Sequence, residues 1–599
     1  MDEKNKMPAV INDSAYRYDS FSNGEVLFGK KNCLPAMGWN SWNAFGSGNT
    51  ELLTKAMAEK IVELGLDKLG YKYVVLDDGC YRAARVDGHL ESDEKKFPGG
   101  FMAMSDFIHG KGLKFGMYND VGSRLCSGLE VGTCGYEDID ARDYIKWKID
   151  YFKIDNCYNV WDNATFSNPE NARFTFAPDI YGIRLIGPDG EVLMEMTSPR
   201  DGIITGTRAF ISGDHVTGNG TYDGTGPDAS PVGEESSELH FKIPVTEPGE
   251  YGLSVLYRSG KSEGCGQWLQ VAVGSEYYYD DFLPETDGGN GSAIWSESIR
   301  IKLGSGENLL RLMNHRRQEN TLTSYAKIRE EFAKIAPDSD IIFSICEWGK
   351  TQPQNWGYKV GDSWRILNDI TFQVGSDGDS GHAAWEGAYT TSVTAQYNKA
   401  VIMDEFAGLG KGWNDPDMLM IGMNGLSETM CKTHMTMWCM LNSPLMLGMD
   451  LRNVEKGDWV YSVISNSDVI ALNQDALGVQ AKRIYTTKAV SPDTTYIRDN
   501  DRLDVLAKPL ADGSVALSFI NVSLGDRGDD IFISKELIKN YIGSKMIRFE
   551  EFFSASGYEV TDIWTKEKKT VSGDCFRLKD FHPDALKACD NVTIIITAF

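Results

Sequence analysis

The sequence predicts an α/β protein: a (β/α)8 barrel with a β-sandwich inserted after its fourth strand and an antiparallel β-sandwich at the C-terminus. Three observations predict this fold. Helix-like and strand-like segments alternate in two separate stretches of the chain, a long stretch between them carries only short strand-like segments, and the end of the chain is again rich in such segments. The length of 599 residues also exceeds what one ordinary core can hold.

The first part of the barrel is predicted over 33–165, after an N-terminal extension over 1–32. Residues 50–70 have apolar side chains at helical spacing and end on Gly70, and the apolar run over 71–79 follows directly. Two further pairs of helix and strand are FMAMSDFIHGKGLK with FGMYNDVG and IDARDYIKWKI with DYFKIDNC. A chain that alternates in this way builds a parallel sheet covered by helices.

The inserted domain is predicted over 166–321, because the helical period disappears there. Short alternating segments separated by Gly, Pro, Asp and Ser replace it, a pattern typical of a β-sandwich. These segments are YGIRLIG, ELHFKIPV, YGLSVLYRSG, QWLQVAVG, SESIRIKLG and NLLRLMN. Residues 322–335 restore a helix and DIIFSICEWG restores a strand, so the sandwich interrupts one βα unit of the barrel.

The barrel resumes over 322–480, and the C-terminal sandwich is predicted over 481–599. Strand and helix signals in WRILNDI, KGWNDPDMLMIG and MTMWCMLNSPLMLGMDL bring the total to about eight strands, the number in a TIM barrel. Beyond residue 480, the segments VALSFINVS, IRFEEFF, YEVTDIWT and NVTIIITAF indicate strands of the last domain.

Composition excludes several classes of function. The formal net charge of −26 argues against nucleic acid or an anionic membrane as a partner, because both repel an acidic surface. Neither a signal peptide nor a membrane span is encoded, so we expect a cytoplasmic protein, or a secreted one whose signal peptide is absent from this sequence. The 11 cysteines form no Cys-x-x-Cys pair or Cys/His cluster, so no zinc site is expected.

Charged residues follow the predicted barrel strands repeatedly. The active site of a (β/α)8 barrel lies at the C-terminal ends of its strands, where charge is tolerated better than inside the barrel. A single carboxylate there is equally well explained as a helix cap. Six carboxylates interleaved with aromatic and basic residues are harder to explain as caps. They are Asp77, Asp78, Asp155, Glu347, Asp369 and Asp417, accompanied by Trp39, Tyr118, Lys153, Trp348 and Arg365.

Carboxylates between aromatic walls, without a metal or phosphate signature, suit a sugar ligand. Hydrolysis of a glycosidic bond uses two carboxyl groups, about 5 Å apart if the configuration at the anomeric carbon is retained. Asp155 and Asp369 form the best pair. Lys153 lies two residues before Asp155, on the same face of the strand, where it favours the ionised carboxylate.

Six ordered sequence blocks resemble the signatures of glycoside hydrolase family 27, in the α-galactosidase clan. The blocks are PAMGWNSWN, LDDG, FGMYNDVG, YFKIDNC, SICEWG with WGYKVGDSWRILNDI, and GWNDPDML. The resemblance implies that Asp155 is the nucleophile, that Asp369 is the acid/base and that Arg365 contacts the substrate. It also implies that no metal or cofactor takes part in the chemistry.

The same resemblance implies a pocket for one terminal sugar, in which Trp39 stacks under the ring and Tyr118 and Asp417 line the wall. Asp77 and Asp78 bind the 4- and 6-hydroxyls, and Lys153 reaches the 3- and 4-hydroxyls. Glu347 with Trp348 fills the space at the 2-position, which favours galactose over N-acetylgalactosamine. An intact Asp78 also favours galactose over β-L-arabinopyranose, which lacks the hydroxymethyl group.

The predicted function is therefore a retaining exo-glycosidase that releases terminal α-D-galactosyl residues from an oligosaccharide or glycoconjugate. β-L-Arabinopyranosidase and α-N-acetylgalactosaminidase activities are the alternatives within the family. A non-catalytic sugar-binding protein would have lost Asp155 or Asp369, and both are present. An isomerase or aldolase would need a phosphate-binding turn or a lysine in an apolar pocket, and Lys153 beside carboxylates fits neither. The sequence leaves open whether the chain forms a homo-oligomer.

Three positions depart from the family pattern. Cys80 stands where many members have tryptophan, and Lys411 is an extra residue before the GWNDP block. Cys126 and Cys157 match a pair that forms a disulfide beside the nucleophile in secreted relatives, and a reducing cytoplasm would leave the two thiols open.

The insert resembles carbohydrate-binding modules of families 6 and 35. Candidates for a sugar platform on it are Trp268, Tyr277 to Tyr279, Trp295 and Asn314. The equally weighted alternative is that Trp268 is a core residue and the tyrosines belong to an ordinary strand. Because the insert follows the strand that carries Asp155, it is expected to emerge on the active-site face, where its position alone would screen large substrates.

Overall fold

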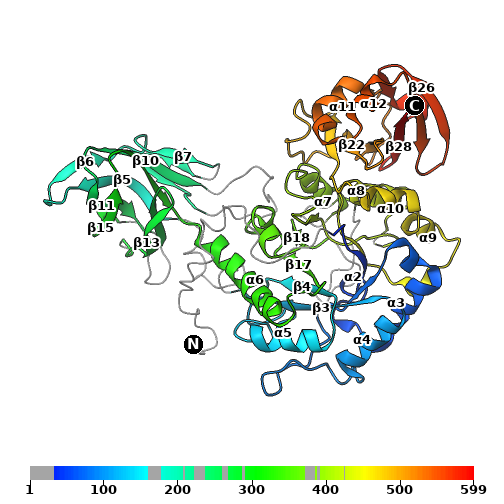
Figure 1. Ribbon diagram of the computed structural model, residues 1–599, viewed down its shortest axis with the longest axis horizontal. Coiled ribbons are helices and arrows are strands. Elements are labelled where there is room, and N and C mark those ends of the chain that lie inside the picture. Colours follow the sequence, from blue (N-terminus) through cyan, green and yellow to red (C-terminus); the bar gives the residue numbers. More distant parts are fainter. Residues whose placement is uncertain are drawn as a thin grey trace.

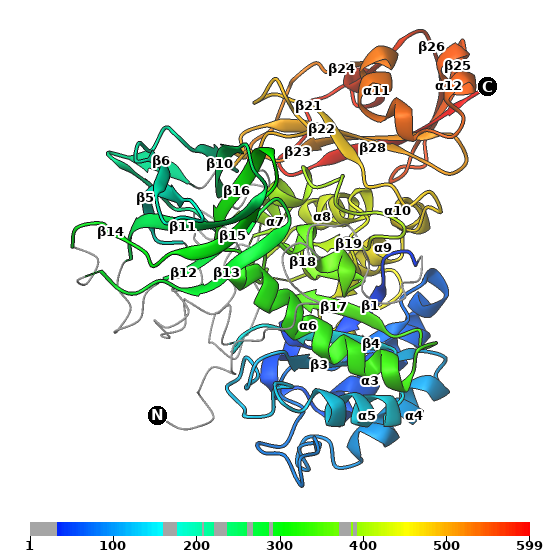
Figure 2. The same ribbon diagram turned by 60° about the vertical axis from the view of Figure 1, so that its left-hand side comes forward.

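A computed structural model gives the architecture of the chain. It describes residues 33–159, 177–206, 209–220, 237–259, 267–286, 291–370, 385–386, 392–423 and 425–599, with only the backbone described at 316–320. The predicted N-terminal extension and the predicted junction at 165/166 lie outside the described residues. Figures 1 and 2 show a central barrel, with the inserted sandwich and the C-terminal sandwich projecting from different sides of it.

In the described part of the chain, eight parallel strands form the barrel, and they follow one another around it in chain order. They are β1 (Met37–Asn40), β2 (Tyr73–Val75), β3 (Lys114–Asp120), β4 (Tyr151–Asp155), β17 (Ile342–Cys346), β18 (Ser363–Arg365), β19 (Trp413–Asp415) and β20 (Leu445–Leu447). β20 also pairs with β1, and Leu419, just after β19, bridges to Leu447 of β20. The ring is thereby closed, and the predicted TIM barrel is confirmed.

Helices that follow the barrel strands cover the outside of the barrel (Figure 2). They are α3 (Glu51–Leu64), α4 (Gly100–Gly110), α5 (Glu137–Lys146), α6 (Arg316–Ile335), α7 (Val393–Ala400), α8 (Glu428–Met440), α9 (Trp459–Ile464) and α10 (Ser467–Asn473), with the short α2 (Trp42–Phe45) after β1. The α3 helix illustrates why they form. The Thr50 hydroxyl caps its first turn, its buried residues recur at helical spacing, and Gly65 ends it with a φ of 75°.

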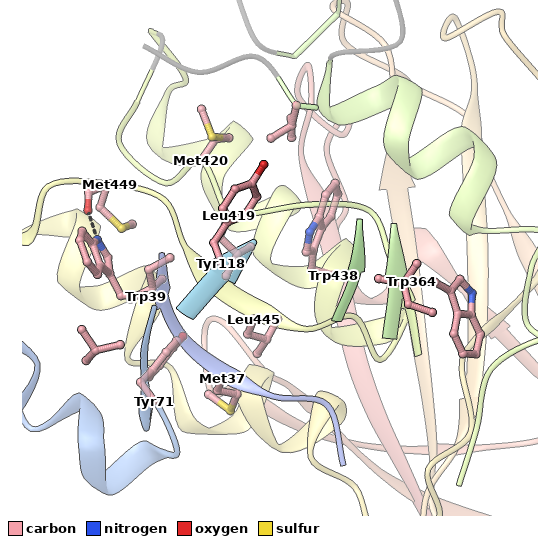
Figure 3. Close-up of a cluster of buried hydrophobic side chains, with 14 of the residues drawn as sticks. Met37, Trp39, Tyr71, Tyr118, Trp364, Leu419, Met420, Trp438, Leu445 and Met449 are labelled. Atoms are coloured by element: carbon pink, nitrogen blue, oxygen red, sulfur yellow. Dashed lines mark hydrogen bonds between the residues drawn. The ribbon is translucent and has the colours of Figure 1, made fainter. Parts of the chain in front are cut away.

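Large side chains fill the barrel core, and Figure 3 shows part of it around Trp39, Tyr118, Leu419 and Trp438. Trp39 is completely buried, and its indole Nε1 donates a hydrogen bond to the backbone oxygen of Met449 at 2.9 Å. A buried indole N–H requires such an acceptor, so this bond fixes the ring in the core.

The insert is a two-sheet sandwich between β4 and α6, as predicted. Its strands are β5 (Asp179–Ile186), β6 (Val192–Met196), β7 (Ile203–Thr205), β8 (Phe210–Ser212), β9 (His215–Thr217), β10 (Glu238–Val245), β11 (Gly249–Arg258), β12 (Trp268–Val273), β13 (Glu276–Phe282), β14 (Ile294–Trp295), β15 (Ile299–Leu303) and β16 (Gly306–Met313). One sheet has the order β13-β12-β16-β10-β7, and the other is built around β11 and β5. Alternate residues such as Leu253 and Val255 face a separate core between the sheets. The α6 helix begins at Arg316, earlier than the predicted start at residue 322.

The C-terminal domain has a six-stranded antiparallel sheet in the order β21-β22-β23-β28-β25-β26 and a two-stranded sheet of β24 and β27. The strands are β21 (Lys482–Thr486), β22 (Leu503–Pro509), β23 (Val515–Asn521), β24 (Phe532–Ser534), β25 (Gly557–Asp562), β26 (Lys568–Ser572), β27 (Cys575–Arg577) and β28 (Asn591–Ala598), accompanied by the helices α11 (Lys535–Ile542), α12 (Phe549–Ser554) and α13 (Leu578–Phe581).

One predicted strand of this domain, IRFEEFF, is wrong, because the structure has the helix α12 there. Phe549, Phe552 and Phe553 stand at positions i, i+3 and i+4, which is helical spacing. Phe552 is buried in the core of the domain. Among the described helices of the whole chain, none combines the length and the apolar character that crossing a membrane requires.

Candidate active site

Charged side chains meet where neighbouring strands of the barrel end. In the parallel register of β3 and β4, Tyr118 is paired with Lys153 and Asp120 with Asp155. Lys153 and Asp155 are two residues apart, so they lie on the same face of β4. The strand pairing therefore sets the relative positions of a phenol, an ammonium group and two carboxylates.

The Asp77 carboxylate is fixed by three donors. Lys153 Nζ and Asn40 Nδ2 each donate to Asp77 Oδ2 at 2.8 Å, and the backbone N–H of Asp78 donates to Oδ1 at 2.9 Å. Burial lowers the pKa of Lys153, but Asp77 and further acidic neighbours, Asp155 among them, more than offset this and hold it well above its usual range. Lys153 therefore stays a cation in a buried position.

Asp155 is almost completely buried and is held in one orientation. The Tyr118 hydroxyl donates to Asp155 Oδ2 at 2.9 Å, and the backbone N–H of Asn156 donates to Oδ1 at 2.9 Å. Burial raises the pKa of Asp155 to about 6; Lys153 acts against this rise and the charge of Asp369 adds to it. At neutral pH, Asp155 is therefore mostly an oriented carboxylate.

Asp369 differs from Asp155 in its exposure, since 40% of its side chain is accessible. Arg365 Nη2 donates to Asp369 Oδ1 at 3.0 Å and lies 2.8 Å from Asp417 Oδ2. Asp417 Oδ2 also accepts the backbone N–H of Ile370 at 2.7 Å. Arg365 thus lies between two carboxylates and ties the segment after β18 to the segment after β19.

Asp78 and Ser127 form the next layer of the site. Both carboxylate oxygens of Asp78 accept hydrogen bonds from Ser127, one from its backbone N–H at 2.7 Å and one from its hydroxyl at 2.9 Å. Burial raises the pKa of Asp78, and the two Ser127 bonds act against the rise. Asp78 is therefore anchored to the loop that follows β3.

The cysteine pair of the sequence analysis is adjacent to Asp155. The sulfur atoms of Cys126 and Cys157 and a carboxylate oxygen of Asp155 all lie within 4.8 Å of one another. In the described part of the chain, the two sulfur atoms are not joined by a disulfide. Among the described residues, these three side chains are also the group whose ligand atoms are close enough together to hold a metal ion.

Glu347 and Trp348 occupy different environments. Glu347 is completely buried, and its Oε1 accepts the backbone N–H and, at 2.7 Å, the hydroxyl of Thr351. Trp348 has a φ of 56° and packs against Cys157 and Cys346. Trp348 is thus in direct contact with the loop after β4, whereas the Glu347 carboxylate is enclosed by its own loop.

The other predicted residues are placed as follows. Trp39 has no exposed surface, so its ring lies in the barrel core (Figure 3). Cys80 is also buried, and Lys411 Nζ donates to the backbone oxygen of Glu405 at 2.9 Å.

On the insert, Trp268 and Asn314 are buried core residues, which agrees with the alternative explanation of Trp268. Trp268 Nε1 donates to Asp280 Oδ1 at 2.8 Å. Trp295 is partly exposed, and Arg184 stacks 4.0 Å from its ring centre.

Four residues of the site were missed by the sequence reasoning, namely Asn40, Asp120, Ser127 and Asp415. Asp120 accepts the backbone N–H groups of Gly122 and Cys157, both at 2.6 Å. Burial raises the pKa of Asp415 to about 6, against the effect of Arg365. Asn40, Asp120 and Asp415 stand inside the quoted blocks at strand ends, so their position was a usable signal. Ser127, in an irregular loop, had none.

Comparison with known proteins agrees with this geometry. The family described as "Alpha galactosidase A" matches residues 34–172 and 315–475, and the "Alpha galactosidase C-terminal beta sandwich domain" matches residues 500–580. Together the matches cover both parts of the barrel and leave out the insert.

Individual relatives are distant in sequence. The chain is 25% identical to alpha-galactosidase A of Cellvibrio japonicus over 540 residues, which are 89% of this chain and 86% of the relative. Alpha-galactosidase I from Mortierella vinacea is similar in structure, with a TM-score of 0.57 and 22% identity, over 94% of this chain and 97% of that one. A β-L-arabinopyranosidase from Geobacillus stearothermophilus has a TM-score of 0.54 and 15% identity, over 94% of this chain and 96% of that one.

The two structural similarities support the fold alone, whereas the family matches cover half of the chain in the order of its barrel segments. The chain therefore belongs to glycoside hydrolase family 27, the family of the α-galactosidases.

Proposed function

We propose that this protein is a retaining α-galactosidase that removes terminal α-D-galactosyl residues by double displacement. The observation that carries the proposal is the contrast between two interacting carboxylates. Asp155 is buried and fixed by Tyr118, whereas Asp369 is 40% exposed and contacts Arg365. A fixed carboxylate suits a nucleophile, and an accessible one suits proton exchange with a leaving group and with water.

In the first step, Asp155 attacks C1 of the galactosyl group while Asp369 gives its proton to the departing oxygen. The C1–O bond to the leaving group breaks and a galactosyl ester of Asp155 forms. Esterification removes the negative charge of Asp155, so Asp369 no longer lies near a second charged carboxylate when it acts as the base. Asp369 then takes a proton from water, whose oxygen attacks C1 and regenerates Asp155. Two inversions at C1 leave its configuration unchanged.

Recognition of the sugar is assigned to Asp77, Asp78 and Lys153. Asp77 and Lys153 are held against each other at 2.8 Å, so together they offer an acceptor and a donor at fixed positions. This arrangement suits vicinal hydroxyls such as those at C3 and C4 of galactose. At the 2-position, the buried Glu347 is assigned to support of its loop, and Trp348 to limiting the space for a substituent.

β-L-Arabinopyranosidase activity is the second candidate, and one observation favours it. Both oxygens of Asp78 already accept hydrogen bonds from Ser127, which reduces the capacity of Asp78 to bind a 6-hydroxyl. A sugar without the hydroxymethyl group has no 6-hydroxyl to bind, so its affinity would suffer less from this arrangement.

The test compares p-nitrophenyl α-D-galactopyranoside, β-L-arabinopyranoside and α-N-acetylgalactosaminide as substrates. We expect the galactoside to have the highest kcat/KM, and we expect Asp155→Asn to lower it by about 10³-fold or more. Asp106→Asn is the matched control, because Asp106 forms an exposed ion pair with Lys148 on the barrel surface.

Azide then separates the two roles. With Asp155→Gly, azide is expected to enter from the free face and give the β-galactosyl azide; with Asp369→Gly, it is expected to attack the ester and give the α-anomer. A higher kcat/KM for the arabinoside would replace the galactoside assignment by the second candidate. Hydrolysis of none of the three substrates, or full activity of Asp155→Asn, would refute the proposed catalytic pair.

A further inference from the structure

A pocket of about 220 Å³ lies between the barrel helix α8 and the C-terminal domain. Its lining includes Lys432 from α8 and, from the C-terminal domain, Trp564, Phe581 and Asp590. None of the residues that line it belongs to the candidate active site around Asp77, Asp155 and Asp369. The volume is below the roughly 300–1,000 Å³ of pockets that hold drug-sized ligands, so it suits a ligand of about one sugar ring.

Contacts between the two domains hold the walls in place. Trp564 Nε1 donates to Thr436 Oγ1 at 3.1 Å, and Asn591 Nδ2 donates to Thr433 Oγ1 at 2.9 Å. The backbone N–H of Trp564 also donates to Asp562 Oδ1 at 2.8 Å. The first bond holds the indole and the third holds the backbone of Trp564, and Lys432 Nζ lies 5.8 Å from the ring centre, so a ligand would meet a preformed aromatic surface with an ammonium group beside it.

Two carboxylates of the lining have capacity for a further hydrogen bond. Asp590 Oδ1 accepts the backbone N–H of Asn591 at 2.8 Å, and Asp562 Oδ1 accepts those of Trp564 and Thr565. The second oxygen of each carboxylate accepts no hydrogen bond from the described residues. Burial raises the pKa of Asp590, although the Asn591 bond, His582 and Lys432 act against the rise. A hydroxyl donor at this position would stabilise the ionised carboxylate.

The charges of the lining favour a neutral ligand. The carboxylates of Asp562, Glu567 and Asp590 line the pocket together with the ammonium groups of Lys432 and Lys569, so neither an anion nor a cation is strongly preferred. An aromatic ring beside hydroxyl acceptors and donors is the combination that recognises the apolar C–H face and the hydroxyls of a sugar.

We propose that this pocket is a second, non-catalytic binding site for a neutral saccharide. It would hold a glycan chain on the enzyme independently of the candidate active site around Asp155 and Asp369. The proposal does not depend on which glycoside the enzyme cleaves.

The test observes Trp564 directly in the full-length protein. The chain is labelled with 5-fluorotryptophan, and the ¹⁹F resonance of Trp564 is identified by its absence in Trp564→Phe. Methyl β-D-galactopyranoside, methyl β-D-glucopyranoside and methyl β-D-xylopyranoside are then added in turn, because an α-galactosidase does not cleave them. We expect at least one of them to shift the Trp564 resonance saturably. Trp459, which is 36% exposed on α9, is the internal control, and its resonance should not move.

Two variants make the result specific. Asp590→Asn is expected to weaken the saturable shift about tenfold or more, because it removes a charged acceptor. Trp564→Ala is expected to abolish binding of the same methyl glycoside in calorimetry while kcat/KM for the aryl galactoside stays unchanged. The proposal is overturned if no glycoside of the panel shifts the Trp564 resonance, if Trp459 shifts equally, or if inorganic phosphate shifts Trp564 and the glycosides do not.

Discussion

Replacement of Tyr118 by Phe tests the electrostatic role of one hydroxyl group. The Tyr118 hydroxyl donates to Asp155 Oδ2 at 2.9 Å, and burial keeps the pKa of Tyr118 well above its usual range, so this donor does not ionise in the working pH range. The hydrogen bond stabilises only the ionised form of Asp155. Its loss therefore raises the pKa of Asp155.

The size of the shift follows from the strength of the bond. A hydrogen bond to a charged group contributes about 1.5–3 kcal/mol, and one pKa unit corresponds to about 1.4 kcal/mol. The pKa of Asp155, about 6 in the native protein, should therefore rise by roughly one to two units in Tyr118→Phe. The acid limb of the kcat/KM profile for the aryl galactoside should move to higher pH by the same amount.

Tyr81→Phe is the control for this experiment. The Tyr81 hydroxyl is equally buried, but it donates to the backbone oxygen of Tyr118 and contacts the Tyr144 hydroxyl instead of a carboxylate. This variant should lose stability and keep the position of the acid limb. An unchanged or lower acid limb in Tyr118→Phe would refute both the assignment of the limb to Asp155 and the electrostatic reasoning.

Three further outcomes are expected. Burial raises the pKa of Asp155 from 3.8 to about 6, so ionisation of this group destabilises the folded protein by at most about 3 kcal/mol. Asp155→Asn should therefore raise the melting temperature at pH 8. This gain should disappear below about pH 4, where Asp155 is protonated in both the folded and the unfolded chain. Arg365→Met leaves the buried Asp417 without its cation, and calorimetry should show a loss of about 3–5 kcal/mol along with a reduced kcat/KM. Glu238→Gln removes the carboxylate that contacts Arg311 at 2.8 Å through both oxygens, so limited proteolysis should cut the insert faster while hydrolysis of the aryl galactoside by the intact variant persists.

Most of the fold could be predicted from the sequence, because local patterns encode it. The helical spacing over residues 50–70 and the apolar runs that end on carboxylates specify the barrel units, and the loss of helical spacing after β4 indicates the insert. The structure ends the first of these helices at Leu64, before Gly65, and not at the predicted Gly70. The segment IRFEEFF was misassigned because a run of aromatics satisfies both strand propensity and helical spacing. Packing of Phe552 into the domain core decides in favour of the helix.

Only the site residues that lie at the ends of strands could be predicted from the sequence. Asp155 and Lys153 follow from alternation along one strand. The anchoring of Asp78 by Ser127 could not be predicted, because an irregular loop determines it. The enclosure of Glu347 by Thr351 depends on the path of another such loop. Likewise, an aromatic in a sandwich strand faces the core or the solvent according to strand pairing, and this pairing buries Trp268.

The position of the insert has a consequence for the order of folding. β4 and β17 are neighbours in the barrel, where Tyr151 pairs with Ile342, although the whole insert separates them in the chain. At the root of the sandwich, the Ala177 N–H donates to the backbone oxygen of Asn219, and Asn219 Nδ2 donates to the backbone oxygen of Leu312 at 2.7 Å.

Once folded, the sandwich therefore holds Ala177 close to Leu312, so less entropy is lost when β17 pairs with β4 than if the whole insert were an open loop. We expect refolded Glu238→Gln to recover activity more slowly than the native chain. By this reasoning the insert, which carries none of the proposed catalytic groups, would speed the step in which β4, the strand that bears Asp155, pairs with β17.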